Sequence, residues 1–273
     1  MRTTTLQYRK WTPWVSVASV ALLGGCQAIG IDLKGVSDAV SALADPLVAQ
    51  AVVIGFEDPD AKELQFLVDA GLLQSGTMIN VYVANAANAA NIAKAPVNGA
   101  RVVLETEDDA FGAPRIGEGS YSIDPTDAIS YEDEEEWTLW IDAGREEASW
   151  IDVILPPAAE LDFPPHPGIG KDIELDLTGQ GYNSADIWVY DEHGIPTWAN
   201  FPTTITELYN QSLATDPLLD VVIPGTAFPR AGTYTIAFGA MVHNSDEQLS
   251  DLNKLLSRGM SGKVRFYQVT IEK

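Results

Sequence analysis

The chain has 273 residues, of which 46% are hydrophobic, and it carries 39 acidic against 16 basic residues, a net charge of −23. This hydrophobic fraction is enough for a packed core and counts against global disorder, while the excess of carboxylates counts against binding to nucleic acid, whose phosphates are bound by Lys and Arg. The chain has one Cys, so no disulfide can form within it.

The first 25 residues are typical of an export signal. Three basic residues lie among the first ten, and an apolar run follows from Trp14 to Leu23, too short to span a membrane stably. The run ends in Leu23-Gly24-Gly25-Cys26. With a Leu three positions before the Cys, this stretch resembles the lipobox of bacterial lipoproteins. An ordinary signal peptide beside a chance Cys is the alternative.

The resemblance implies that Cys26 becomes the first residue of the mature chain and carries a thioether-linked diacylglycerol and an acylated amine. Gln27, rather than Asp, follows it, which by the same resemblance favours the outer membrane of a Gram-negative cell. The mature chain would keep 13 basic and 39 acidic residues, a net charge of −26. We therefore expect the lipid to be the link to the membrane, with the body on either its periplasmic or its external face.

Residues 26–45 are expected to form a tether that contains a short helix. Four apolar residues recur at near-helical spacing between 32 and 44, and Asp45-Pro46 ends the pattern. Gly35 weakens the helix, which would either dock on the body or remain a loose tether.

Residues 46–157 predict a first β-sandwich. Short β-rich runs alternate here with Gly, Asp and Pro turns, which favours an antiparallel sandwich. The stretch 61–76 fits a helical turn or a loop, and the Ala/Asn-rich stretch 85–95 predicts an exposed loop. The expected strands are 48–54, 77–83, one formed within 96–105, 119–123, 137–141 and 150–154.

Three features in residues 77–157 occur in a known order. They are Pro96-Val97-Asn98-Gly99-Ala100-Arg101-Val102, then Gly119-Ser120-Tyr121, then an aromatic strand that leads to Pro156-Pro157. This order resembles the immunoglobulin- or prealbumin-like modules of carboxypeptidase regulatory-like domains and of uncharacterised outer-membrane lipoproteins. The shared residues are core and turn residues, so the resemblance implies a fold and no catalytic group.

Residues 158–168 predict a Pro-rich linker, and 169–273 a second β-sandwich. Gly232-Thr233-Tyr234 repeats the Gly-x-Tyr pattern of the first half, which suggests two related modules in tandem. The expected strands are 173–177, 186–190, 218–223, 233–238 and 264–271.

One helix is predicted inside the second module. Ser245 with Gln248 forms a capping box, and Arg258-Gly259 is a helix end. Between them, four leucines share one helical face: Leu249, Leu252, Leu255 and Leu256. This helix would close an open edge of the sandwich or, as the alternative, bind a partner.

Signatures of catalysis are missing from the sequence. It contains no His-Glu-x-x-His, no Gly-x-Ser-x-Gly and no phosphate-binding loop. The three histidines, His166, His193 and His243, lack the spacing of metal ligands. We therefore expect a protein that is not an enzyme and needs no cofactor.

Carboxylates are concentrated in residues 105–147, which contain 15 acidic residues and only two basic ones, Arg115 and Arg145. A solvated acidic face is the first interpretation. Oxygen ligands of this kind also suit Ca²⁺, although no Asp-x-Asp-x-Asp-Gly loop is present. The candidate metal ligands are Asp108, Asp109, Asp133 and Glu135. Glycoside hydrolysis by a pair of carboxylates is a third, weaker interpretation.

Two tryptophans form the second candidate site. Alternation along 137–141 directs Trp137, Leu139 and Ile141 to one face and Trp140 to the other. A hairpin that turns near 145–146 would bring Trp140 beside Trp150, with Asp142 and Asp152 adjacent. Paired Trp rings suit a sugar or a protein ligand; burial against another part of the chain is the alternative.

The sequence thus predicts an all-β protein of two tandem antiparallel β-sandwich modules, with an N-terminal tether and one inserted helix. The expected function is that of a lipid-anchored binding or structural module of the cell envelope, with an envelope protein or a glycan as partner. A Ca²⁺- or carbohydrate-binding surface protein is the alternative.

Overall fold

The structure is a computed structural model that describes residues 47–57, 76–85, 95–126, 128–165, 167–201, 211, 214–244, 246–254 and 256–273. The signal, Cys26, the 26–45 tether, most of the stretches 61–76 and 85–95, and His166 lie outside these residues. No helix among those described is long and apolar enough to cross a bilayer.

The elements bounded in this part of the chain are fourteen strands and two 3-10 turns, so the all-β prediction is confirmed. They are β1 (Leu47–Phe56), β2 (Gly76–Asn85), β3 (Arg101–Glu105), β4 (Ala110–Ala113), β5 (Ser120–Thr126), β6 (Glu136–Asp142), β7 (Ser149–Ile154), β8 (Ile173–Asp176), β9 (Ser184–Tyr190), β10 (Pro196–Ala199), β11 (Asp220–Ile223), η3 (Gly225–Ala227), β12 (Gly232–His243), η4 (Asp246–Gln248), β13 (Leu249–Ser250) and β14 (Arg258–Ile271).

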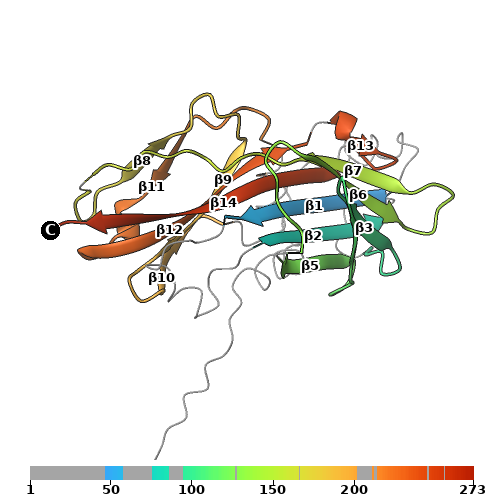
Figure 1. Ribbon diagram of the computed structural model, residues 1–273, viewed down its shortest axis with the longest axis horizontal. Helices are drawn as coiled ribbons and strands as arrows, with labels where there is room; N and C mark the ends of the chain where they lie inside the picture. Colours follow the sequence, from blue (N-terminus) through green and yellow to red (C-terminus); the bar gives the residue numbers. More distant parts are fainter. Residues whose placement is uncertain are drawn as a thin grey trace, which may run out of the picture.

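One seven-stranded sheet runs the length of the molecule, in the order β10-β9-β12-β14-β1-β2-β5 (Figure 1). Its central strand, β14, pairs antiparallel with β12 from Met260 to Ile271 and parallel with β1 along its first half. The β1–β14 pairing is the only parallel one among the strand pairs described. The last strand of the chain therefore joins the two halves of the molecule.

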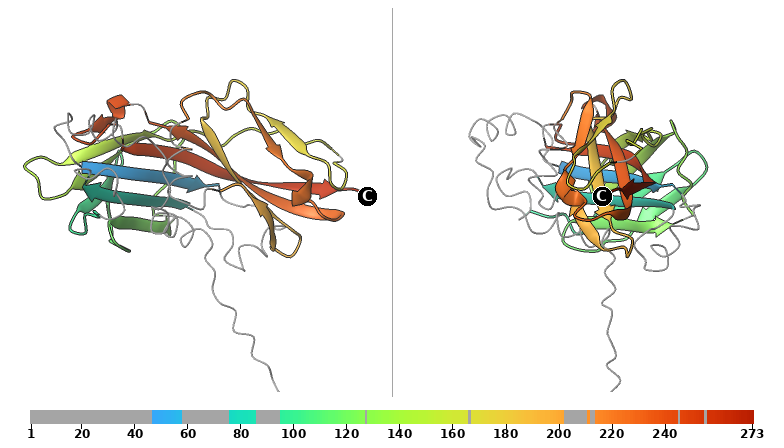
Figure 2. Two further views of the ribbon diagram at one scale, coloured as in Figure 1. Left: turned by 180° about the vertical axis from the view of Figure 1, so that it is seen from behind. Right: turned by 90° about the vertical axis from the view of Figure 1, so that its left-hand side faces the viewer.

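Two smaller sheets cover opposite ends of this large sheet (Figure 2). The five-stranded sheet β13-β7-β6-β3-β4 encloses the first core with alternate residues of β1 and β2, such as Val53 and Val81. The two-stranded sheet β11-β8 encloses the second core with β9, β12 and the end of β14, through residues such as Ile187 and Phe238. The two sandwiches are present and share one layer.

The chain passes from the first core to the second between Leu155 and Ala159, and Leu161 and Phe163 already pack against the second core. A later part of the chain packs in the first core again, since Leu249 and Leu252 are buried there. Whether 158–168 separates units that fold alone stays a prediction.

The prediction of a helix at 245–258 is wrong. Leu249 and Ser250 form strand β13, which pairs with Ile151 and Trp150 of β7, and Asp251 has a positive φ of 54° that an α-helix does not admit. Leu249, Leu252 and Leu256 are buried as the helical pattern required. They reach the core from a short edge strand and from turns. The reason is that the free backbone N–H and C=O groups at the edge of β7 pair with β13, which a helix could not do. Ser245 and Leu255 lie outside the described residues.

Candidate functional site

The outer face of the five-stranded sheet carries the predicted tryptophans. In β6, Trp137, Leu139 and Ile141 are buried in the first core, whereas Trp140 is half-buried on the opposite face, so the predicted alternation is confirmed. The sheet has no second layer on that side among the strands described. Trp140 of β6 and Trp150 of β7 are both partly exposed on this face.

Trp140 and Trp150 are directly opposite each other on β6 and β7. Their ring centroids lie 5.4 Å apart with an interplanar angle of 49°, and both side chains are half-buried. The indole N–H of Trp140 donates a hydrogen bond to the carboxylate of Glu105 on β3. The hairpin thus pairs the two rings as predicted, and Glu105 fixes one of them.

Carboxylates border the two rings. Asp152 accepts a 2.7 Å hydrogen bond from the hydroxyl of Thr138, and Asp142 accepts a 2.9 Å bond from the backbone N–H of Gly144. Ser250 lies opposite Trp150 at the sheet edge. A ligand on this face would meet two aromatic surfaces within a border of oxygen acceptors, a combination that matches the apolar ring faces and the hydroxyls of a sugar.

A cavity of about 540 Å³ opens at the β3–β4 end of the same sheet. It is a shallow depression, wide open to solvent, and its lining includes Arg101, Gly112, Arg115 and Tyr121. The hydroxyl of Tyr121 donates to the carbonyl of Val97 at 2.7 Å and accepts from the N–H of Ala100 at 2.9 Å. Burial raises the pKa of Tyr121, and the hydrogen bond from Ala100 and the charge of Arg115 oppose that rise. The phenol is neutral at pH 7 and holds the wall of the cavity.

The four candidate Ca²⁺ ligands are not brought together. Asp108 and Asp109 lie in the exposed turn after β3, while Asp133 forms an ion pair with Lys263 at 2.7 Å. Glu135 accepts a 3.4 Å hydrogen bond from the backbone of Glu107. Across the described ranges, no three His, Cys, Asp or Glu side chains are placed to hold a metal ion.

A hydroxyl–imidazole pair was not foreseen from the sequence. Ser184 lies 2.9 Å from Nε2 of His243, whose Nδ1 lies 2.9 Å from the carbonyl of Ala214. A carbonyl only accepts, so Nδ1 carries the proton and the Ser184 hydroxyl donates to Nε2. Burial lowers the pKa of His243, which keeps the ring neutral.

This pair resembles the first two members of a nucleophilic triad, but Ser184 is only 7% exposed and donates its proton into the ring. A backbone carbonyl takes the place of the carboxylate that would stabilise an imidazolium. We assign the pair a structural role, in which it fastens the segment around Ala214 to the large sheet. The second described histidine, His193, is exposed beside Glu192.

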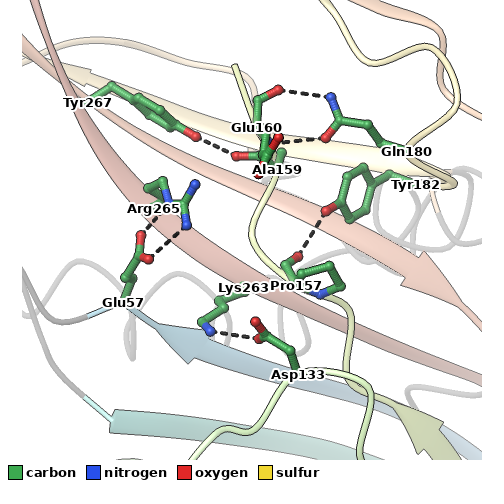
Figure 3. Close-up of polar contacts among 10 residues, drawn as sticks. All are labelled: Glu57, Asp133, Pro157, Ala159, Glu160, Gln180, Tyr182, Lys263, Arg265 and Tyr267. Carbon is green, nitrogen blue, oxygen red and sulfur yellow. Dashed lines mark hydrogen bonds and ion pairs between the residues drawn. The ribbon is translucent and has the colours of Figure 1, made fainter. Parts of the chain in front are cut away.

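Polar contacts fill the space between the two cores (Figure 3). Here the connector that carries Pro157, Ala159 and Glu160 passes over β14. Tyr267 donates to the carbonyl of Ala159, and Tyr182 donates at 2.9 Å to that of Pro157. Burial raises the pKa of Tyr182 to about 12, so the phenol remains a donor.

Two ion pairs complete this seam between the cores. Arg265 contacts both oxygens of Glu57, at 2.9 Å for Nη2, and this hydrogen bonding raises the pKa of the guanidinium. Lys263 pairs with Asp133. Lys263 and Arg265 of β14 are thus both held in ion pairs between the two cores.

No family model matches the chain, and no curated protein matches it. Among solved structures, the Tp47 lipoprotein of Treponema pallidum is similar at 11% identity and a TM-score of 0.34, over 85% of this chain and 52% of its own. A two-domain fibronectin type III segment of chicken tenascin is 7% identical with a TM-score of 0.24, over 72% of this chain and 92% of its own. A DUF3823 family protein from Bacteroides ovatus is 8% identical with a TM-score of 0.23, over 82% of this chain and 99% of its own.

The chain spans about half of Tp47. At these identities and TM-scores the likenesses carry no argument about activity, and the description of the fold as an all-β sandwich rests on its sheets and cores.

Proposed function

We propose that this chain is a non-enzymatic binding module of a bacterial cell envelope, held at the outer membrane by lipid on Cys26, and that it binds carbohydrate on its paired-tryptophan face. We define that face as Trp140 and Trp150 with the neighbouring Glu105, Asp142 and Asp152. The lipobox and Gln27 support the anchoring.

The observation that carries the proposal is the cross-strand pair of rings at 5.4 Å on a sheet face without a second layer among the described strands. Both rings are large apolar surfaces held in place, Trp140 by its bond to Glu105. Because the rings are already held in place, they lose little side-chain entropy when a sugar stacks on them. Each ring contributes binding free energy through its contact area.

The border of the face favours a sugar over a protein as ligand. The centres of protein–protein interfaces are depleted in charged residues, because a carboxylate that loses water without a partner is costly. Here Glu105, Asp142 and Asp152 surround only two rings. Sugar hydroxyls can donate to these carboxylates and replace the water they lose.

Affinity electrophoresis in gels that contain soluble polysaccharides, followed by calorimetry on those that retard the protein, tests the proposal. Trp140→Ala and Trp150→Ala are each expected to reduce affinity at least tenfold, while Trp140→Phe keeps part of it. Ile195→Ala serves as the control, because Ile195 is a 57% exposed apolar residue on the second sandwich. Retardation that survives loss of both rings would rule out this face as the binding site.

A further inference from the structure

The arginine-lined cavity lies at the β3–β4 edge and borders the paired-tryptophan face, which Gly112 and Arg101 share with it. Gly112 of the cavity is directly opposite Val103, which is opposite Trp140, which is opposite Trp150. These four positions lie on four neighbouring strands, so the row is about 14 Å long at the usual strand spacing. That is the length of a few sugar residues.

Arg101 belongs to the same surface. Residues 101, 103 and 105 of β3 alternate with the buried Val102 and Leu104, so Arg101 shares the outer face with Val103. It is also opposite Asp142 in the strand register. A ligand that lies on the rings would therefore reach Arg101 without crossing to another surface.

Within the described residues, Arg101 and Arg115 form no ion pair, in a chain with more than twice as many acidic as basic residues. Lys263 and Arg265 are each paired with a carboxylate. In contrast, neither Arg101 nor Arg115 has a carboxylate within 4.0 Å in the described part of the chain. Both are exposed at the cavity, where a guanidinium can present its donors to an incoming oxyanion.

The cavity wall is built before any ligand arrives. Tyr121 holds the turn that precedes β3 through its two hydrogen bonds to Val97 and Ala100. The side chain of Asn98 accepts a 2.8 Å hydrogen bond from the N–H of Gly119, which ties the same turn to the start of β5. A wall fixed in this way loses little conformational freedom on binding.

We propose that this cavity takes the oxyanion of an acidic polysaccharide whose sugar rings lie on Trp140 and Trp150, with Arg101 and Arg115 as the anion-binding residues. The inference rests on the proposed function and narrows its ligand to the anionic glycans. The oxyanion can be the carboxylate of a uronic acid or a sulfate ester, since either accepts hydrogen bonds from a guanidinium.

The net negative charge of the chain makes this inference easy to test. A body with a large negative charge repels a polyanion, so a preference for the charged form of a polymer has to come from a local site. Two matched probes compare charge at constant backbone: polygalacturonate against its methyl ester, and dextran sulfate against dextran. For at least one pair, the charged polymer is expected to bind about tenfold more tightly than the neutral one, the scale of a charge-assisted hydrogen bond.

Three variants locate the preference. Arg101→Gln combined with Arg115→Gln should lower affinity for the charged polymer to that for the neutral one. Gly112→Leu should do the same without changing charge, because a Cβ at Gly112 meets no atom within 4 Å and a longer side chain would occupy the cavity. Lys171→Gln combined with Arg230→Gln, two exposed cations of the second sandwich, is the matched control and should keep the preference.

The outcomes separate this inference from the proposed function. If charged and neutral polymers bind equally, or if the control variant loses the preference as fully as the arginine variant, the anion site is overturned while carbohydrate binding stands. If no polymer of either pair binds but another polysaccharide does, the anion site is overturned alone; if no polysaccharide retards the protein, both fail. Tighter binding of polygalacturonate identifies a carboxylate as the ligand group, and tighter binding of dextran sulfate identifies a sulfate.

Discussion

The ring of Tyr131 occupies the space above Gly55 in which a side chain at that position would lie. A Cβ built on Gly55 would stand 2.2 Å from Cδ2 of Tyr131. The hydroxyl of the same tyrosine donates at 2.9 Å to the carbonyl of Pro156, and Nζ of Lys263 lies 5.3 Å from the ring centroid. Gly55 and Lys263 are opposite each other in the β1–β14 pair. Tyr131 thus fastens the start of the connector to the shared sheet.

This contact predicts that Gly55→Ala destabilises the protein. The added methyl cannot coexist with the ring, so either the tyrosine or β1 must shift, and overpacking of this kind costs about 1–3 kcal/mol. For a protein of this size we expect a melting temperature several degrees lower, measured by circular dichroism. Gly112→Ala is the control, since nothing lies within 4 Å of a Cβ there. Equal melting temperatures of the two variants would contradict the packing described.

Local patterns were sufficient to predict most strands and the faces of β6. The alternation of Trp137, Thr138, Leu139, Trp140 and Ile141 repeats every two residues, as a strand with one buried face requires. The pairing of Trp140 with Trp150 followed from the same alternation and a short hairpin. Both features are encoded within about fifteen residues, which is why sequence reasoning reached them.

Long-range pairing was beyond the reach of such patterns. Nothing near Val53 indicates that its neighbour in the sheet is Ser261, more than two hundred residues later. The leucines from Leu249 onward fit a helix by spacing, and only the open edge of β7 turns them into a strand. The cavity was missed for the same reason. Arg101 and Arg115 both line the cavity because β3 and β4 pair with each other, and the spacing of the two arginines in the sequence does not indicate this pairing.

The shared sheet predicts that a cut in the Pro-rich connector leaves the molecule intact. With a specific protease site inserted after Pro165, an exposed position, the cut chain should still elute as one species in size-exclusion chromatography and separate only in denaturant. The reason is that β14 keeps its seven register pairs with β1, and Leu249 and Leu252 stay in the first core. The uncut insertion variant is the control. Fragments that part in native buffer would show that 158–168 divides two independent domains.

The lipobox predicts that Cys26→Ser abolishes acylation and leaves the precursor unprocessed or in the wrong compartment. A diacylglycerol and a further acyl chain bury tens of CH₂ groups at about 0.8 kcal/mol each, so the loss of membrane attachment should be complete. Detergent-phase partitioning and intact mass of the wild-type and variant proteins measure it. A wild-type protein that stays in the aqueous phase, without lipid mass on Cys26, would refute the anchoring.

Asp186 predicts a dependence of stability on pH. The residue is 6% exposed, and its carboxyl accepts a 2.8 Å hydrogen bond from the side chain of Gln211. Burial raises its pKa from 3.8 to about 6, against the opposing effect of that hydrogen bond. The folded state therefore binds the proton more tightly than the unfolded state does. The stabilisation from this difference is fully present below pH 3.8 and is lost as the pH rises to about 6.

Above pH 6 the wild-type protein keeps a buried charge that Asp186→Asn removes. The shift of about two pK units corresponds to roughly 3 kcal/mol, so the variant should be more stable than the wild type at pH 7.5 by up to that amount and should lose this advantage by pH 4. Comparing the two proteins cancels the opposite contribution of His243, whose lowered pKa removes stability as the pH falls. Urea unfolding at both pH values measures the difference, with the exposed Asp162→Asn as the control for loss of one negative charge. An advantage of Asp186→Asn that is the same at pH 4 and pH 7.5 would show that the carboxyl is not the group that titrates.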